Sequence, residues 1–124
     1  MTQELQEKIL DGMQQLATAS NEQAAANEEY AMAEFEYRQA RAKGFAELSI
    51  EKIDGKKRTD THIDSLVDIA VKGEMLRVRL AEARRDTANE LIRSLRAQLS
   101  AGQSLLGAVR AEVEALRYGQ TAGA

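Results

Sequence analysis

The sequence predicts an all-α protein, built as a long antiparallel helical hairpin of the coiled-coil type. The chain has 124 residues and no proline, and 30% of its residues are charged. Because proline breaks helix interiors, its absence permits long uninterrupted helices. Aromatic residues make up only 4% of the chain, too few for an ordinary globular core around a binding pocket. A composition rich in Ala, Glu, Lys, Leu and Arg is typical of long helices and coiled coils.

A seven-residue repeat of apolar side chains between Ala88 and Leu116 is the third observation behind this fold class. Alternating steps of four and three residues place these side chains on one stripe of a helix, the seam of a coiled coil. Leu91 and Leu105 widen the seam beyond what one partner helix covers, and broad stripes favour larger bundles. We therefore expect a homodimer or higher homo-oligomer that forms a dimeric helical bundle. The expected interface consists of Leu91, Ile92, Leu95, Leu99, Leu105, Leu106, Val109, Val113 and Leu116.

The first arm of the hairpin is predicted over residues 3–53. Between Leu16 and Tyr30 its apolar residues are almost all alanines, which let two helices approach closely but bury little surface. Ser20 and Gln23 have the spacing of a capping box, which starts a helix. A kink or break near residues 18–21 is therefore a second interpretation of this arm.

A polar connector is predicted over residues 54–61. Gly55 suits the left-handed conformation that ends a helix, and Asp60 or Thr61 suits the cap of the next helix.

The second arm is predicted over residues 62–118, followed by a disordered tail at 119–124, so that residues 1–118 form a single domain. The arm begins on a different apolar stripe, with Leu66, Leu76 and Leu80, and the main seam takes over near Ala88. Such a change of phase resembles a stutter in a coiled coil.

Charge distribution favours the antiparallel arrangement. Residues 1–36 carry eight acids and one base, whereas residues 69–118 carry nine bases and six acids. Folding back about residue 58 would bring acids 28–36 beside the basic residues Arg77, Arg79, Arg84 and Arg85. Exposed ion pairs are worth only ~0–1 kcal/mol each, so we expect them to select register more than to add stability.

Basic residues of the connector are the candidate nucleic-acid contact. Such binding is electrostatic and salt-sensitive, but acids surround the connector and no aromatic residues alternate with the bases for stacking. A solvated loop is the favoured interpretation over nucleic-acid binding. The candidate contacts with a partner or a nucleic acid are Lys56, Lys57 and Arg58 of the connector, with Arg84 and Arg85 in a second patch.

The sequence gives weaker signals for a metal site, a catalytic site or an aromatic binding site. Asp60, His62 and Asp64 have ligand-like spacing, but a metal needs three or four convergent groups, and a capped helix start explains them better. Only one histidine is present, and no catalytic constellation surrounds it. We expect no enzyme, no cofactor and no bound metal. The aromatic side chains fit the core better than a partner-binding site; they are Tyr30, Phe35, Tyr37 and Phe45.

The sequence features that bear on localisation favour the cytoplasm. The first residues are polar and acidic, unlike a signal peptide, and no apolar run approaches the ~18 residues of a membrane span. The absence of cysteine leaves the redox compartment open.

Two segments of the second arm, 68–77 and 93–104, resemble small helical proteins encoded by tailed bacteriophages. Gly102 departs from the large residue expected in its seam position, and the resemblance assigns no functional residues. It implies a phage accessory protein in the cytoplasm of a bacterial host. We therefore expect a non-enzymatic, self-associating helical protein that binds another protein through exposed helix faces. The alternative is a recombination or replication accessory protein that contacts DNA through the basic connector.

Overall fold

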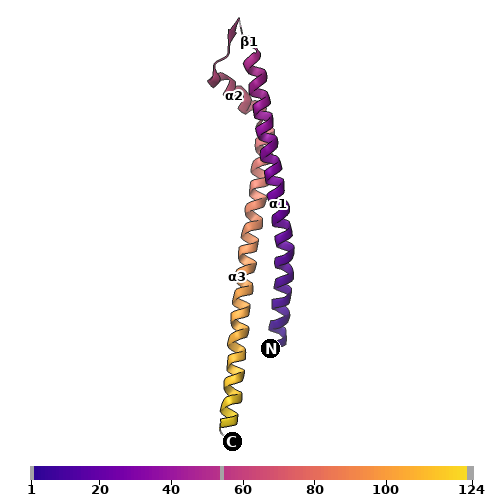
Figure 1. Ribbon diagram of the computed structural model, residues 1–124, viewed down its shortest axis with the longest axis vertical. Helices are drawn as coiled ribbons and strands as arrows, with labels where there is room; N and C mark the ends of the chain where they lie inside the picture. The colour runs from indigo at the N-terminus through magenta and orange to yellow at the C-terminus, as the bar shows by residue number, and fades with distance from the viewer. Residues whose placement is uncertain (1, 54, 123–124) are drawn as a thin grey trace. The chain divides into compact units, whose positions relative to one another are not determined.

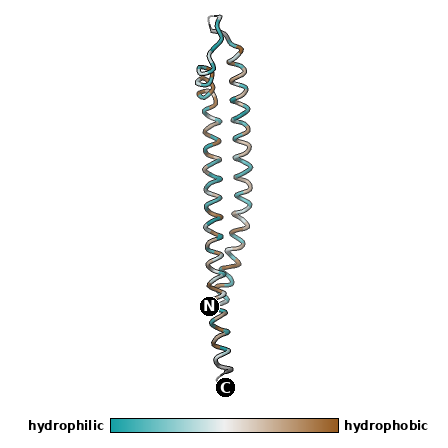
Figure 2. The backbone as a smooth tube through the Cα atoms, turned by 60° about the vertical axis from the view of Figure 1, so that its left-hand side comes forward, coloured by the Kyte–Doolittle hydropathy of each residue, from teal (hydrophilic) through white to brown (hydrophobic). Residues whose placement is uncertain are grey.

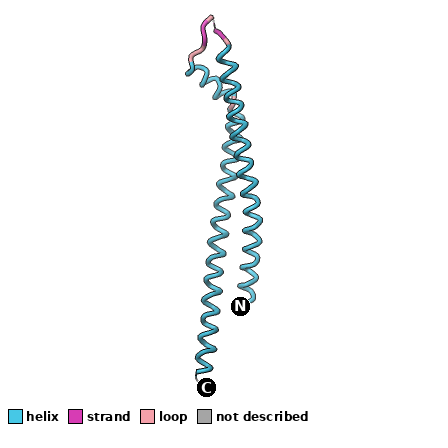
Figure 3. The backbone as a smooth tube through the Cα atoms, in the orientation of Figure 1, coloured by secondary structure: helices cyan, strands magenta, loops and turns pink. Residues whose placement is uncertain are grey.

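The computed structural model describes residues 2–53 and 55–122, and this part of the chain is almost wholly helical (Figure 1). Three helices and two very short strands follow one another, as Figure 3 shows. The prediction of an all-α protein is confirmed. In chain order the elements are α1 (Thr2–Ile50), β1 (Lys52–Ile53), β2 (Lys56–Lys57), α2 (Asp60–Ala70) and α3 (Lys72–Ala122).

Two compact units make up the chain, where the sequence predicts one domain over residues 1–118. Unit 1 comprises Met1–Glu22 and Ala88–Ala124, and unit 2 comprises Gln23–Thr87. Each unit therefore pairs a segment of α1 with a segment of α3, and each is described by itself below.

Helix α1 is continuous, so the break considered near residues 18–21 does not occur. The hydroxyl of Thr18 donates a hydrogen bond of 3.2 Å to the backbone carbonyl of Gln14, one turn earlier. This bond satisfies the hydroxyl inside the helix. Ala19 beside it is buried, at 3% exposure, which holds this turn against α3.

In unit 1, small residues of one helix lie against large residues of the other. A methyl group at Gly12 would lie 3.8 Å from Leu99 Cδ1, and one at Gly102 would lie 3.4 Å from Ile9 Cγ1. At these two places α1 and α3 lie close together within unit 1. A methyl group at either glycine would thus make ordinary van der Waals contact with the facing side chain.

Unit 2 has its own apolar core where α1 and α2 meet, with Val71 just after α2. Ile63, Val67 and Val71 are buried there, at 2%, 0% and 4% exposure. Tyr37 and Phe45 of α1 pack against them. The preference for a core role is thus confirmed for these two aromatic residues, whereas Phe35 is 61% exposed.

The buried stripe of α3 keeps one seven-residue phase, which corrects the expected change near Ala88. Val78 and Ala81 are buried before that point, and Ile92 and Leu95 after it. Val78 and Ala81 are smaller than Ile92 and Leu95, so residue size misled the sequence interpretation. Figure 2 shows apolar residues recurring in short bands along both long helices. The stripe taken as a second seam includes Leu76 and Leu80, which are 59% and 54% exposed.

Between α1 and α2 lies a two-stranded antiparallel ladder, with β1 at the end of the predicted first arm and β2 in the predicted connector. Lys52 pairs with Lys57, and Ile53 pairs with Lys56. Gly55 has φ of 75°, the left-handed conformation predicted for it and favoured by glycine. The expected connector begins at Asp54, which lies outside the described residues.

Helix α2 begins at Asp60, two residues before the predicted start of the second arm, because Thr59 is its cap. Thr59 is extended, and its side-chain oxygen accepts a hydrogen bond of 3.2 Å from the backbone N–H of His62. This satisfies one of the free N–H groups of the first turn. The predicted caps, Asp60 and Thr61, lie inside the helix.

The second arm is two helices rather than the single helix predicted over 62–118. Val71 separates them, with φ of −98° and ψ of 16°, and its N–H still bonds to the Val67 carbonyl at 2.9 Å. The change of direction buries Val71 beside Val67. At the other end, α3 continues to Ala122, so the tail predicted to be disordered is helical at 119–122. The absence of proline allows this extension, and the last two residues lie outside the described part.

Candidate functional site

Five of the nine predicted interface residues are buried or half-buried within unit 1. Ile92 and Leu95 are buried, at 3% and 8% exposure, in one cluster with Ala19 and Leu16. Leu99, Leu106 and Val109 are half-buried. Ile92 and Leu95 are therefore already packed against α1 of the same chain, whereas an oligomer interface at Leu99, Leu106 and Val109 stays a prediction.

The other four predicted interface residues are exposed on unit 1. Leu91 and Leu105 are 44% and 56% exposed, and Val113 and Leu116 are 43% and 68% exposed. Leu10 and Met13 of α1 are also exposed, at 61% and 50%. Large aliphatic side chains in water are costly when they gather, so unit 1 carries apolar surface that another chain can cover.

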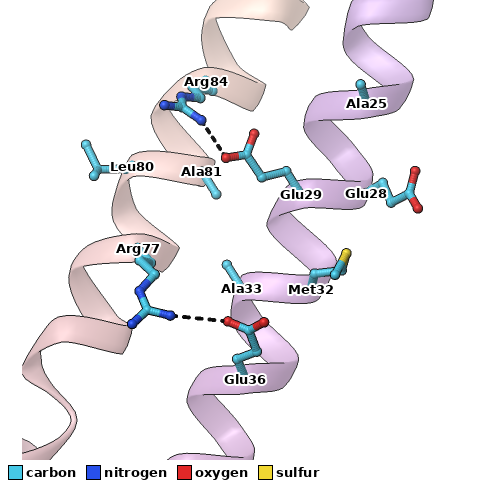
Figure 4. A pocket seen from close by; sticks show the side chains of 10 residues that line it. All are labelled: Ala25, Glu28, Glu29, Met32, Ala33, Glu36, Arg77, Leu80, Ala81 and Arg84. Carbon is cyan, nitrogen blue, oxygen red and sulfur yellow. Dashed lines mark hydrogen bonds and ion pairs between the residues drawn. The ribbon is translucent and has the colours of Figure 1, made fainter.

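An open groove crosses the face of unit 2 between α1 and α3, with a volume of about 490 Å³. Figure 4 shows Ala33 and Ala81 pointing toward each other between the helices. Met32 and Leu80, which are 58% and 54% exposed, lie on the two outer edges. We call this surface the unit 2 groove; its lining residues are Ala25, Glu28, Glu29, Met32, Ala33, Glu36, Arg77, Leu80, Ala81 and Arg84.

Two ion pairs cross the unit 2 groove with acids on α1 and bases on α3. Arg84 Nη1 lies 2.5 Å from Glu29 Oε1, and Arg77 Nη1 lies 3.5 Å from Glu36 Oε2 (Figure 4). These are pairs of the kind that the charge distribution predicts. Sequence reasoning missed Met32 and placed Leu80 in a seam. The sequence signal that indicates the groove is the row of acids on α1 with the row of bases on α3, and not a pattern of apolar residues.

The five predicted nucleic-acid contacts do not form one patch of free cations. Arg84 pairs with Glu29, and the guanidinium carbon of Arg85 lies 4.0 Å from the centroid of the Tyr30 ring, a cation–π contact. Both arginines thus make contacts within unit 2 that compete with a phosphate.

At the strand pair, Lys56 and Lys57 are exposed. The side chain of Arg58 is only 15% exposed, and its Nη1 lies 2.8 Å from Glu51 Oε2. Its Nε is buried without a hydrogen-bond partner. The structure therefore leaves two of the five predicted contacts open to solvent at the strand pair.

The segment with ligand-like spacing at the start of α2 serves helix capping and pairing. Arg41 of α1 donates hydrogen bonds to Asp68 and, at 3.3 Å, to Asp64 Oδ1. The bond to Asp68 raises the pKa of the Arg41 guanidinium above its usual range. Within residues 2–53 and 55–122, no three or more His, Asp or Glu side chains are grouped to hold a metal ion.

Comparison with protein-family models, curated proteins and solved structures finds no match to this chain. Among the described helices, none combines the length and apolar character that crossing a bilayer requires.

Proposed function

We propose that this chain is a non-enzymatic helical protein that folds as an antiparallel hairpin, self-associates and binds another protein through exposed helix faces. The observation that carries the proposal is the exposure of Leu91, Leu105, Val113 and Leu116 on unit 1. Burying a leucine contributes ~1.5–3 kcal/mol, so covering several of them favours association. The resemblance to small phage proteins extends the proposal to a phage accessory role.

Light scattering after size-exclusion chromatography tests self-association. We expect the wild-type chain to be a dimer or larger at micromolar concentration. Changing Leu91 and Leu105 together to glutamate should make it monomeric, because burying an unpaired carboxylate between two chains costs free energy. Circular dichroism should show unchanged helix content, since both side chains are exposed.

The matched control changes Ser94 and Ser104 to glutamate. These two residues are exposed on the same helix, and the control adds the same negative charge without removing apolar surface. It should keep the wild-type mass. A monomeric wild-type chain would contradict self-association, and a double leucine variant that keeps its mass would place the interface elsewhere.

A second candidate function is nucleic-acid binding by the strand pair, which the exposure of Lys56 and Lys57 favours. Mobility-shift assays at low and moderate salt should then show binding that weakens with salt. Changing Lys56 and Lys57 to glutamate should abolish the shift. The control changes Lys72 and Arg79, two exposed cations on α3, to glutamate. It gives the same net charge and should preserve the mobility shift. No shift at low salt, or equal loss in both variants, would remove this candidate.

A further inference from the structure

The unit 2 groove carries an arrangement of charge that selects one way of binding a second copy. Glu29 and Glu36 lie on α1, and Arg84 and Arg77 lie opposite them on α3. Each acid therefore sits at the same level along the pair of helices as one base. Met32 lies between the two acids in sequence and Leu80 between the two arginines, so these apolar residues also share a level.

Two arrangements with twofold symmetry bring the unit 2 groove of one chain against the unit 2 groove of a second copy. If the twofold axis runs parallel to the helices, α1 of one copy lies on α3 of the other and levels are preserved. Glu29 then meets Arg84 of the second copy, and Met32 meets Leu80 of the second copy. If the axis runs across the helices, α1 lies on α1 and α3 on α3. Acids then meet acids and arginines meet arginines.

Like charges placed opposite each other disfavour the second arrangement, whereas the first gives every charge an opposite partner. The side chains of the four charged residues are about half to two-thirds exposed, from 48% to 66%, and are therefore accessible to a second chain. The apolar edges add a reason to associate, because Met32 and Leu80 are both more than half exposed.

We propose that the unit 2 groove binds the same groove of a second copy, with α1 of each chain against α3 of the other. The inference rests on the proposed self-association and specifies a face and an orientation for it. In sequence, Leu91 and Leu105 continue the seven-residue row of Arg77 and Arg84 along α3. The row that carries the basic residues of the groove thus also carries two of the exposed leucines of the proposed interface.

Disulfide cross-linking distinguishes the two orientations, because the chain contains no cysteine and single replacements supply the only thiols. The variants are Met32→Cys and Leu80→Cys, each oxidised alone and as an equal mixture that has been unfolded and refolded together. A disulfide requires Cβ atoms about 3.5–4.5 Å apart, so only facing positions react. We expect a covalent dimer in the mixture and none in either variant alone.

A matched control mixes Phe35→Cys with Leu80→Cys. Phe35 is 61% exposed but does not line the groove, so this mixture should give no covalent dimer. Cross-linking of Met32→Cys alone would show α1 on α1 and overturn the proposal. A dimer by light scattering without cross-linking in the mixture would overturn this face while leaving self-association intact. A monomer by light scattering would overturn both.

Discussion

Replacing Ile63 by alanine is expected to lower the free energy of unfolding by about 2–5 kcal/mol, the range for removing a buried isoleucine side chain. Ile63 is 2% exposed and packs in the unit 2 core with Val67 and Val71. The loss combines the hydrophobic transfer free energy of the removed groups with the cavity left behind. Because this core joins α2 to α1, the region around α2 should unfold first.

The matched control makes the same substitution six residues later on the same helix. Ile69 is 71% exposed, so Ile69→Ala should change the free energy of unfolding by less than about 0.5 kcal/mol. Urea unfolding followed by circular dichroism, at one fixed protein concentration, measures both variants. Equal losses in the two variants would mean that α2 does not pack with Ile63 toward α1.

Fold class and helical periodicity follow from the sequence because they depend on local properties. The absence of proline and the seven-residue repeat predict long helices, and Gly55 predicts the left-handed turn that the structure contains. The ion pairs between α1 and α3 follow from the same reasoning, since charge rows on two helices limit how they can pair. Arg84 with Glu29 is one example.

Packing partners are less predictable, because burial depends on what lies opposite each residue. Ala81 is buried at 2% exposure while its neighbour Leu80 is 54% exposed, the reverse of what hydrophobicity indicates. Ala81 faces α1, where it lies opposite Ala33 in the narrow space between helices (Figure 4). Which of these two neighbours is buried therefore depends on the side of α3 that faces α1, and not on residue size.

The candidate interface shows the same limit. Ile92 and Leu91 are adjacent and both apolar, yet only Ile92 is buried by α1. The seven-residue repeat identifies the apolar stripe of α3. How much of this stripe is buried depends on where the partner helix lies, which the repeat does not specify. The sequence indicates that Leu91 and Leu105 lie beyond the cover of one partner helix, and both are exposed, but it does not say how far along α3 that cover extends.

The largest loss expected in unit 1 comes from a charge at Ala19. This residue is 3% exposed and lies in the apolar cluster of Ile92 and Leu95. Ala19→Asp would bury an unpaired carboxylate, whose desolvation costs several kcal/mol even after the surroundings relax. We expect the free energy of unfolding to fall by about 3 kcal/mol or more.

Ala17→Asp is the matched control for this change. Ala17 is exposed two residues earlier on α1, so the variant carries the same charge and a similar change in helix propensity without burying the carboxylate. Its free energy of unfolding should fall by less than about 1 kcal/mol. Hydrogen exchange should show lost protection in residues 88–109 of the Ala19 variant and normal protection in the control. Normal protection in both variants would mean that this turn of α1 does not cover Ile92, and the division between buried and exposed residues of the α3 stripe would then have to be drawn again.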